Sequence, residues 1–175
     1  MQQFVELLHT AGIGAIADVR RHPGSRRQPW FARDALAASL PAHGIAYSHH
    51  PELGGRRARA SDSPNGGWEN ASFQGYADWM ATPEFAAGVA RLEEAAKAAP
   101  TATMCAEAQW WRCHRRLLAD ALLVRGWRVR HVMPDGRVTD HELTSFAVVR
   151  EGRITYPPSQ LSLPTPNGRT GEPPR

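Results

Sequence analysis

The sequence predicts an α/β domain layered around a mainly parallel sheet. Helical and strand patterns alternate along the chain, and the segment 13–19 is almost wholly apolar, as in a parallel strand buried on both faces. The 175 residues are 42% hydrophobic and 22% charged, a composition typical of one soluble globular domain. We expect residues 1–156 to form this single domain and residues 157–175, rich in proline and glycine, to form a flexible tail.

The first half of the chain predicts two helix–strand pairs. Each helical stripe ends at a glycine, Gly12 or Gly44, the residue that commonly follows a helix. The short apolar runs after these glycines predict strands. In chain order, the elements are a helix over 4–11, a strand over 13–19, a helix over 32–43 and a strand over 45–49. The loops are 20–30 and 51–72, and the second is long enough to be functional or mobile.

The second half predicts further helices and strands. Thr82 and Pro83 open a helix, because threonine caps the first turn and proline fits the first helical position. Gly126 closes another helix, and residues 134–136 (Pro-Asp-Gly) form a turn. In chain order, we expect helices over 73–80 and 82–98, a strand over 101–106, a helix over 113–125, a strand over 127–133, a short helix or strand over 142–149 and an ordered segment over 153–156.

Charge and composition limit the classes of function. Twenty-one basic and seventeen acidic side chains give a net charge of +4, and the pI near 9.7 permits an anionic partner without naming one. No run of eighteen apolar residues is present, so we expect no membrane span. No basic-then-apolar leader opens the chain, so we expect a cytoplasmic protein. Two cysteines are too few for a disulfide scaffold.

Polar and charged residues collect where the predicted strands end. Ligands of layered α/β folds bind beyond the carboxyl ends of the strands, so this coincidence predicts one shared site. The residues after the first strand are Asp18, Arg20, Ser25 and Arg26; those after the second include His49, His50 and Glu52; those after the third are Cys105, Glu107, Cys113, His114 and Arg115.

The segment 104–116 permits three interpretations. Cys105, Cys113 and His114, optionally with Glu107, resemble a zinc ligand set, although the chain lacks a CxxC pair and adjacent Cys-His residues rarely bind one ion. One cysteine is alternatively a thiolate nucleophile, activated by the helix N-terminus and His114. In the third interpretation both cysteines are inert, buried side chains. Trp110 and Trp111 precede this helix and are expected to wall a pocket.

Several separated motifs resemble one family. They are the segments 18–26 (Asp-Val-Arg-x-x-Pro-x-Ser-Arg), 44–47 (Gly-Ile-x-Tyr), 52–55 (Glu-Leu-Gly-Gly), 76–85 (Tyr-x-x-Trp-Met-x-Thr-Pro-x-Phe), 105–107 (Cys-x-Glu) and 113–115 (Cys-His-Arg). On these motifs the chain resembles the domain of unknown function 488 family over residues 4–156. The resemblance implies a three-layer, Rossmann-like α/β domain of bacterial or archaeal type, and no activity. Related chains are expected to begin with an additional strand and a Gly-His-Ser turn; without them, apolar surface beside the sheet would be exposed.

The leading hypothesis is an enzyme that acts on a phosphorylated or nucleic-acid-like anion, such as a nucleotide. We expect the catalytic groups to be Asp18, Glu107, Cys105 and His114. We expect the substrate-binding groups to be Arg20, Ser25, Arg26, Tyr47, Cys113 and Arg115. No cofactor is expected, with zinc or another divalent metal left open. The alternatives are a non-catalytic nucleic-acid-binding module, a metal-dependent hydrolase, and a redox or sulfur-transfer role for the two cysteines.

Overall fold

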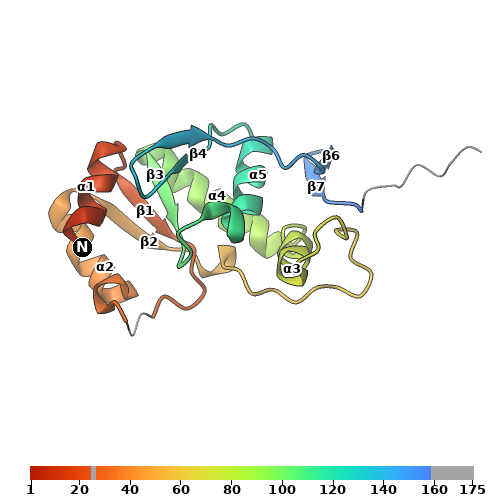
Figure 1. Cartoon of the computed structure of the whole chain (residues 1–175), viewed down its shortest axis with the longest axis horizontal. Coiled ribbons are helices and arrows are strands. Elements are labelled where there is room, and N and C mark those ends of the chain that lie inside the picture. Colours follow the sequence, from red (N-terminus) through yellow and green to blue (C-terminus); the bar gives the residue numbers. More distant parts are fainter. Residues whose placement is uncertain (25–26, 159–175) are drawn as a thin grey trace, which may run out of the picture.

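Three parallel strands form the central sheet of the computed structural model, which describes residues 1–24 and 27–158 (Figure 1). Strand β1 (Ala15–Asp18) lies between β2 (Ala46–His49) and β3 (Thr101–Met104), and both neighbours run parallel to it. All four β1 residues are buried, as expected for the middle strand of a parallel sheet covered on both faces. The α/β class and the parallel sheet are therefore confirmed.

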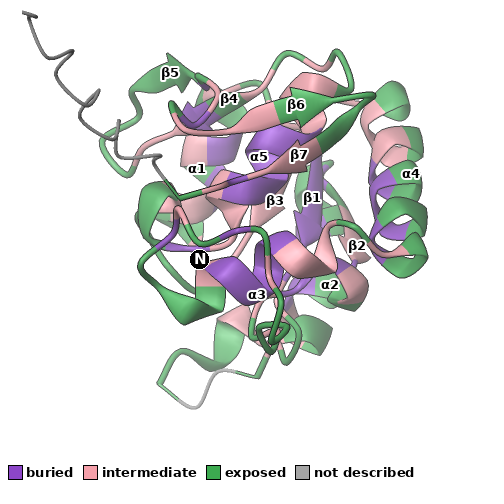
Figure 2. Ribbon diagram, turned by 90° about the vertical axis from the view of Figure 1, so that its right-hand side faces the viewer, coloured by how far each residue is buried: buried purple, intermediate pink, exposed green. Residues whose placement is uncertain are grey.

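Helices cover both faces of this sheet. Helices α1 (Gln2–Thr10) and α2 (Arg33–Ser39) pack with Ile16 of β1 on one face. Helices α3 (Ala71–Trp79), α4 (Pro83–Ala98) and α5 (Arg115–Val124) pack with Ala17 and Val19 on the other. Because side chains alternate along a strand, β1 supplies apolar groups to both faces and links the two cores. Figure 2 shows buried residues on β1 and on the inner sides of α5 and α3.

Local signals in the sequence explain where the helices begin and end. The Thr82 hydroxyl accepts a hydrogen bond from the Phe85 N–H at the start of α4, and the Asn70 side chain caps α3. Gly44 adopts the left-handed conformation after α2 has continued as a short 3₁₀ helix, η2 (Leu40–His43). The other 3₁₀ turns are η1 (Pro29–Phe31), η3 (Pro51–Leu53) and η4 (Trp110–Arg112).

The second half of the chain differs from the expectation. Strand β4 (Arg130–Val132), predicted as part of 127–133, pairs antiparallel with β5 (Val138–Asp140), and no pairing joins it to β3 in the described residues. The intervening turn contains Gly136 at a φ of 82°, which favours this reversal. A second hairpin joins β6 (Val148–Arg150) to β7 (Arg153–Thr155). Strand β3 is therefore an edge of the central sheet.

The long loop after β2 packs tightly on α3. The Arg57 guanidinium donates to the carbonyls of Gly54 and Glu52 and lies 3.7 Å above the Trp79 ring. A Cβ atom at Gly75 would overlap the Arg57 carbonyl oxygen. These contacts explain why a small residue stands inside α3 and show that the Arg57 side chain holds the loop in place.

Two expectations from the sequence concern membrane spans and the residues that the structure does not describe. None of the helices in the two described ranges is long and apolar enough to cross a membrane. Ser25 and Arg26, both expected to bind substrate, lie outside the described residues, as does the expected tail from residue 159 onward.

Candidate functional site

Asp18 is the centre of a closed ion-pair network at the end of β1. Its side chain is fully buried, and Arg20 donates from Nε to Oδ1 at 2.8 Å and from Nη2 to Oδ2 at 2.6 Å. The Tyr47 hydroxyl donates to Oδ2 at 2.7 Å, and burial and this bond raise the pKa of Tyr47. Arg20 also donates to the Phe31 carbonyl. This network joins β1, β2 and η1, and its charged groups are paired with one another.

Four other predicted residues lie together on the opposite face of the sheet, where β3 ends and α5 begins. We call Cys105, Cys113, His114 and Arg115 the thiol cluster. One donor atom from each of Cys105, Cys113 and His114 lies within 4.8 Å of the others. Arg115 donates from Nε to the Cys113 Sγ at 3.1 Å, and its backbone N–H points to the same sulfur at 3.4 Å. The structure thus brings these residues together and separates them from Asp18.

The two cysteines have unequal acidity. A hydrogen bond from the Cys105 thiol to Cys113, with the Arg115 charge adding to it, lowers the pKa of Cys113, and the same bond raises the pKa of Cys105. Both thiols are free, and Cys113 is only 5% exposed. Of the two thiols, Cys113 is therefore the one that ionises more readily, and its sulfur lies beside the Arg115 guanidinium.

His114 is held by contacts on several sides. A Cβ atom at Gly55 would lie 2.8 Å from its Nδ1, so only glycine permits this close approach. The ring contacts the Tyr76 ring at a centroid distance of 5.0 Å and hydrogen-bonds to the Val19 backbone. Burial lowers the pKa of His114 to about 4, with a further contribution from the Arg115 charge. Its Nε2 atom is buried and has no hydrogen-bond partner among the described residues.

Glu107 occupies an exposed position between the two cysteines. Its backbone carbonyl accepts a hydrogen bond from Arg115 Nη2. Its carboxylate forms no ion pair within the described ranges. Arg115 therefore anchors the loop at this point through main-chain oxygen atoms.

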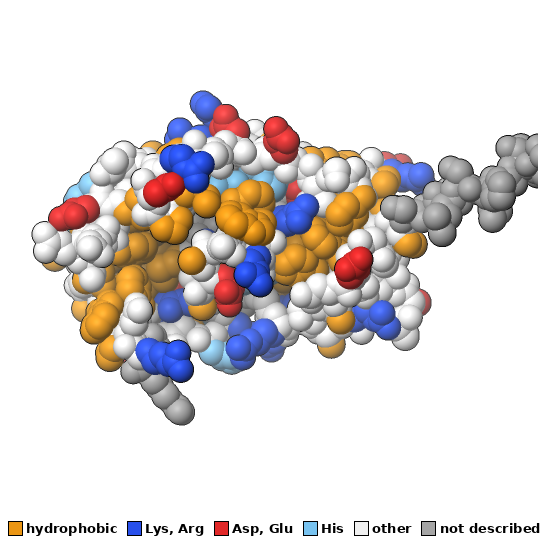
Figure 3. Space-filling model, in the orientation of Figure 1, with side chains coloured by type: hydrophobic (Ala, Val, Ile, Leu, Met, Phe, Trp, Pro, Cys, Tyr) orange, Lys and Arg blue, Asp and Glu red, His pale blue; other side chains and the backbone are white. Residues whose placement is uncertain are grey.

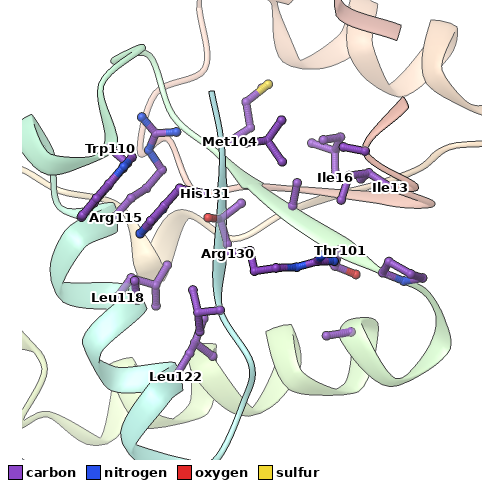
Figure 4. Close-up of a pocket in the computed structure, with 18 of the residues that line it drawn as sticks. Ile13, Ile16, Thr101, Met104, Trp110, Arg115, Leu118, Leu122, Arg130 and His131 are labelled. Carbon is purple, nitrogen blue, oxygen red and sulfur yellow. The ribbon is translucent and has the colours of Figure 1, made fainter. Parts of the chain in front are cut away.

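A groove of about 360 Å³ separates β3 from β4, and we call it the β3–β4 groove. Apolar side chains of α1, β1, β3, α4 and α5 form most of its wall, and Figure 3 shows hydrophobic side chains gathered on this face of the molecule. Trp110, Arg115 and His131 lie together at one side, and Ile13, Ile16 and Thr101 lie opposite them (Figure 4). Trp110 lines this groove as expected, whereas Trp111, which was also expected to wall a pocket, is not part of the lining and is 39% exposed.

Cationic side chains dominate the charge of this groove. Arg115, Arg128 and Arg130 line it, and its lining contains one acid, Glu93, which is paired with Arg125. Arg130 is exposed and forms no ion pair within the part of the chain that the structure describes. The lining of the groove is thus mostly apolar and its charged side chains are mainly cationic, although Arg128 also pairs with Asp140.

A buried chain of hydrogen bonds ends at the groove wall. His131 Nε2 lies 2.9 Å from His141 Nδ1, and His141 Nε2 lies 2.9 Å from Asp120 Oδ1. The Trp110 ring stacks on His131 at 3.6 Å with an interplanar angle of 1°. Burial lowers the pKa of His131 to about 4, with smaller contributions from His141 and the Arg115 charge. We call Asp120, His141 and His131 the histidine relay.

Sequence reasoning missed the histidine relay. No role was expected for His131 or His141 from the sequence, but both are buried, at 8% and 6% exposed. A signal was present in Asp120, which stands inside the apolar segment 117–124 of α5. A carboxylate at such a position needs buried partners, and those partners come from a distant part of the chain.

These features define a three-layer α/β protein with a largely buried thiol cluster beside a groove of mostly apolar lining and mainly cationic charge. The family model described as domain of unknown function DUF488 matches residues 1–122, and the chain belongs to this family. The match includes the Asp18 network, the thiol cluster and Asp120, and it ends before His131 and His141. Comparison with curated proteins and with solved structures gave no match.

Proposed function

We propose that the protein is an enzyme that acts on a phosphorylated or nucleotide-like anion bound in the β3–β4 groove. The observation that carries the proposal is the position of His131, which lines the groove while the relay behind it ends at a buried carboxylate. In α/β folds with a parallel sheet, ligands commonly bind near the carboxyl ends of the strands. Trp110 and Arg115 lie just after the carboxyl end of β3.

The groove fits a ligand with an apolar part and an anionic part. Its volume lies within the range of small-molecule sites, and the apolar side chains of its lining suit a heterocyclic ring. Arg130 forms no ion pair among the residues that the structure describes, and the described hydrogen bonds of Arg115 use its backbone N–H, Nε and Nη2, so Nη1 is proposed to contact the ligand. Guanidinium groups bind phosphate oxygens through paired hydrogen bonds, so these two arginines are the proposed anion ligands.

The relay supplies a general base. The His141 Nε2–H donates a hydrogen bond to Asp120, so His141 Nδ1 carries the lone pair and accepts a hydrogen bond from the His131 Nε2–H. The remaining nitrogen of His131, Nδ1, then carries a lone pair and is able to take a proton from an attacking water or hydroxyl group. Asp120 stabilises the positive charge that forms on the histidine pair, as in other catalytic triads.

The other predicted residues act around this centre in the proposal. Asp18, Arg20 and Tyr47 are assigned a structural role: they stabilise the carboxyl ends of β1 and β2, because their side chains already pair with one another. Glu107 is exposed next to the groove-lining Ala108 and remains a candidate acid or base.

The experiment separates binding from turnover. Nucleoside mono- and diphosphates and short oligonucleotides are screened by thermal shift, and the best ligand is titrated against the wild type, Arg130→Ala, Arg115→Ala and His131→Gln. Loss of a charge-assisted hydrogen bond costs about 1.5–3 kcal/mol, so each arginine variant should bind roughly tenfold to a hundredfold more weakly. Arg150→Ala, which removes an exposed arginine on β6 away from the groove lining, is the matched control.

His131→Gln is expected to retain binding and to lose turnover of the bound compound by at least about a hundredfold. Absence of any ligand-induced shift in the wild type contradicts the proposal, as does equal binding by Arg130→Ala, Arg115→Ala and Arg150→Ala. Salt-sensitive oligonucleotide binding without turnover would identify a nucleic-acid-binding module instead.

A further inference from the structure

We infer that Cys105, Cys113 and His114 form a zinc-binding site, which is separate from the groove chemistry proposed above. The observation is that one donor atom from each of these residues lies within 4.8 Å of the other two. Two thiol sulfurs and one imidazole nitrogen are a donor set that selects zinc over magnesium or calcium. The three residues come from the segment that joins β3 to α5.

The donor spacing is close to what zinc requires. Zn–S bonds of about 2.3 Å and Zn–N bonds of about 2.0 Å in a tetrahedron place the donor atoms about 3.5–3.8 Å apart. The upper limit of 4.8 Å therefore calls for side-chain movements of about 1 Å, without a change of fold. The site is assembled by the folded chain before an ion arrives.

The backbone explains how adjacent residues bind one ion. Cys113 has extended dihedral angles, φ −135° and ψ 170°, whereas His114 is helical at φ −57° and ψ −16°. The chain turns between them at the entrance to α5. This turn removes the objection that the sequence raised, because neighbouring side chains on a regular strand would point to opposite faces.

The surroundings of His114 are those of a metal ligand. Its Nε2 is buried without a partner among the described residues, while the ring bonds to the Val19 backbone. Histidine ligands of zinc commonly donate the second ring nitrogen to a backbone carbonyl, which fixes the tautomer and directs the free lone pair at the metal. An ion bound at Nε2 gives this buried nitrogen the partner it lacks.

Arg115 completes the surroundings of the sulfurs. It donates two hydrogen bonds to the Cys113 Sγ, and hydrogen bonds of this kind hold a ligating thiolate in place. Two thiolates, one neutral imidazole and Zn²⁺ have no net charge, so the nearby guanidinium does not repel the assembled site. Three protein ligands leave the fourth tetrahedral position for water or a substrate atom.

The test measures metal binding directly. Untagged, fully reduced protein is stripped of metal and titrated with Zn²⁺ in competition with a chromophoric chelator, and with Co²⁺ while the thiolate-to-cobalt absorption is recorded. We expect about one equivalent of either ion and a strong thiolate-to-cobalt band. Cys105→Ser, Cys113→Ser and His114→Gln should each weaken zinc binding at least about tenfold. His43→Gln, which alters an exposed histidine after α2, should bind as the wild type does.

Two outcomes overturn the inference: binding of less than about a tenth of an equivalent by the reduced wild type, or equal affinities of His114→Gln and His43→Gln. If a cysteine variant does not fold, the wild type alone decides, because bound zinc should slow modification of both thiols by a thiol reagent. Equal modification rates with and without zinc count against the site. Nucleotide binding by Arg130→Ala and Arg150→Ala is read separately, so either proposal can fail without the other.

Discussion

Replacement of Asp120 by alanine should be among the most damaging single substitutions in this protein. The carboxylate is fully buried in α5, and three groups from later parts of the chain donate to it. His141 Nε2 and the Thr144 N–H lie 2.9 and 3.0 Å from Oδ1, and the Tyr156 hydroxyl lies 2.8 Å from Oδ2. The substitution therefore leaves three buried donors without an acceptor.

The cost follows from these three bonds. A buried donor left unsatisfied costs about 1–3 kcal/mol, and neighbouring losses are only partly additive, so we expect about 4 kcal/mol in all. This is a large share of the roughly 5–15 kcal/mol that stabilises a typical domain. Asp140→Ala is the matched control, because Asp140 pairs with Arg128 at 3.3 Å on the surface, where both side chains are more than half exposed. An exposed pair of this kind contributes no more than about 1 kcal/mol.

The assay is urea-induced unfolding of the wild type and both variants at neutral pH, followed by tryptophan fluorescence and by far-ultraviolet circular dichroism. Trp110 stacks on His131 at the end of the relay and should report its loss in the fluorescence signal. The reasoning is refuted if Asp120→Ala and Asp140→Ala have the same unfolding free energy within about 0.5 kcal/mol.

Three further predictions concern stability. Gly75→Ala should lower the free energy of thermal unfolding by about 3 kcal/mol, because the added methyl group meets the backbone of the facing loop. Gly136→Ala is the comparison: its φ is positive but the space around it is open, so the loss should be about 1 kcal/mol. Equal losses in the two variants would contradict the packing argument. The pKa of His131 is lowered to about 4, so between pH 6.5 and 4 the unfolded chain binds a proton at this ring that the native protein does not. The unfolding free energy should therefore decrease as the pH falls through this interval, by about 2 kcal/mol from His131 alone, and His131→Gln should show a shallower slope; an unchanged slope would refute this. Tyr47→Phe removes one hydrogen bond from Asp18 and should lower the unfolding free energy measured in urea by about 1–2 kcal/mol. No loss of stability would show that Arg20 alone is enough to compensate the buried Asp18 carboxylate.

Local patterns predicted the sheet and the helices because those signals are short-range. The Thr82 cap, the glycines after α1 and α2 and the apolar run at 13–19 each act within a few residues, and the structure has an element at each of them. The pairing of β4 depended instead on a turn two residues beyond it. The sequence contained that turn, but the alternation of helices and strands favoured a parallel partner, and the antiparallel hairpin was not predicted.

The same difference between short-range and long-range signals decided which parts of the candidate site were predicted. Cys105, Cys113, His114 and Arg115 were predicted together because they lie within one eleven-residue segment, and the end of β3 and the start of α5 hold them close. Asp18 was grouped with them on its position at a strand end, but its side chain points to the other face, where Tyr47 meets it. The histidine relay joins residues 10 and 21 positions apart through tertiary packing. No local pattern specifies such contacts.

The contacts of Tyr156 indicate how much of the chain is needed for folding. Its side chain is fully buried, its N–H donates to the Asn65 side chain, and its carbonyl accepts from the Gly67 N–H. A polypeptide that ends at residue 122, where the family-model match ends, would lack the Tyr156 ring that packs beside Trp68. It would also leave Asp120 without the hydrogen-bond donors that come from later in the chain. Such a fragment should aggregate or remain largely unfolded, because the segment that the family model matches is shorter than the part of this protein that packs as one unit.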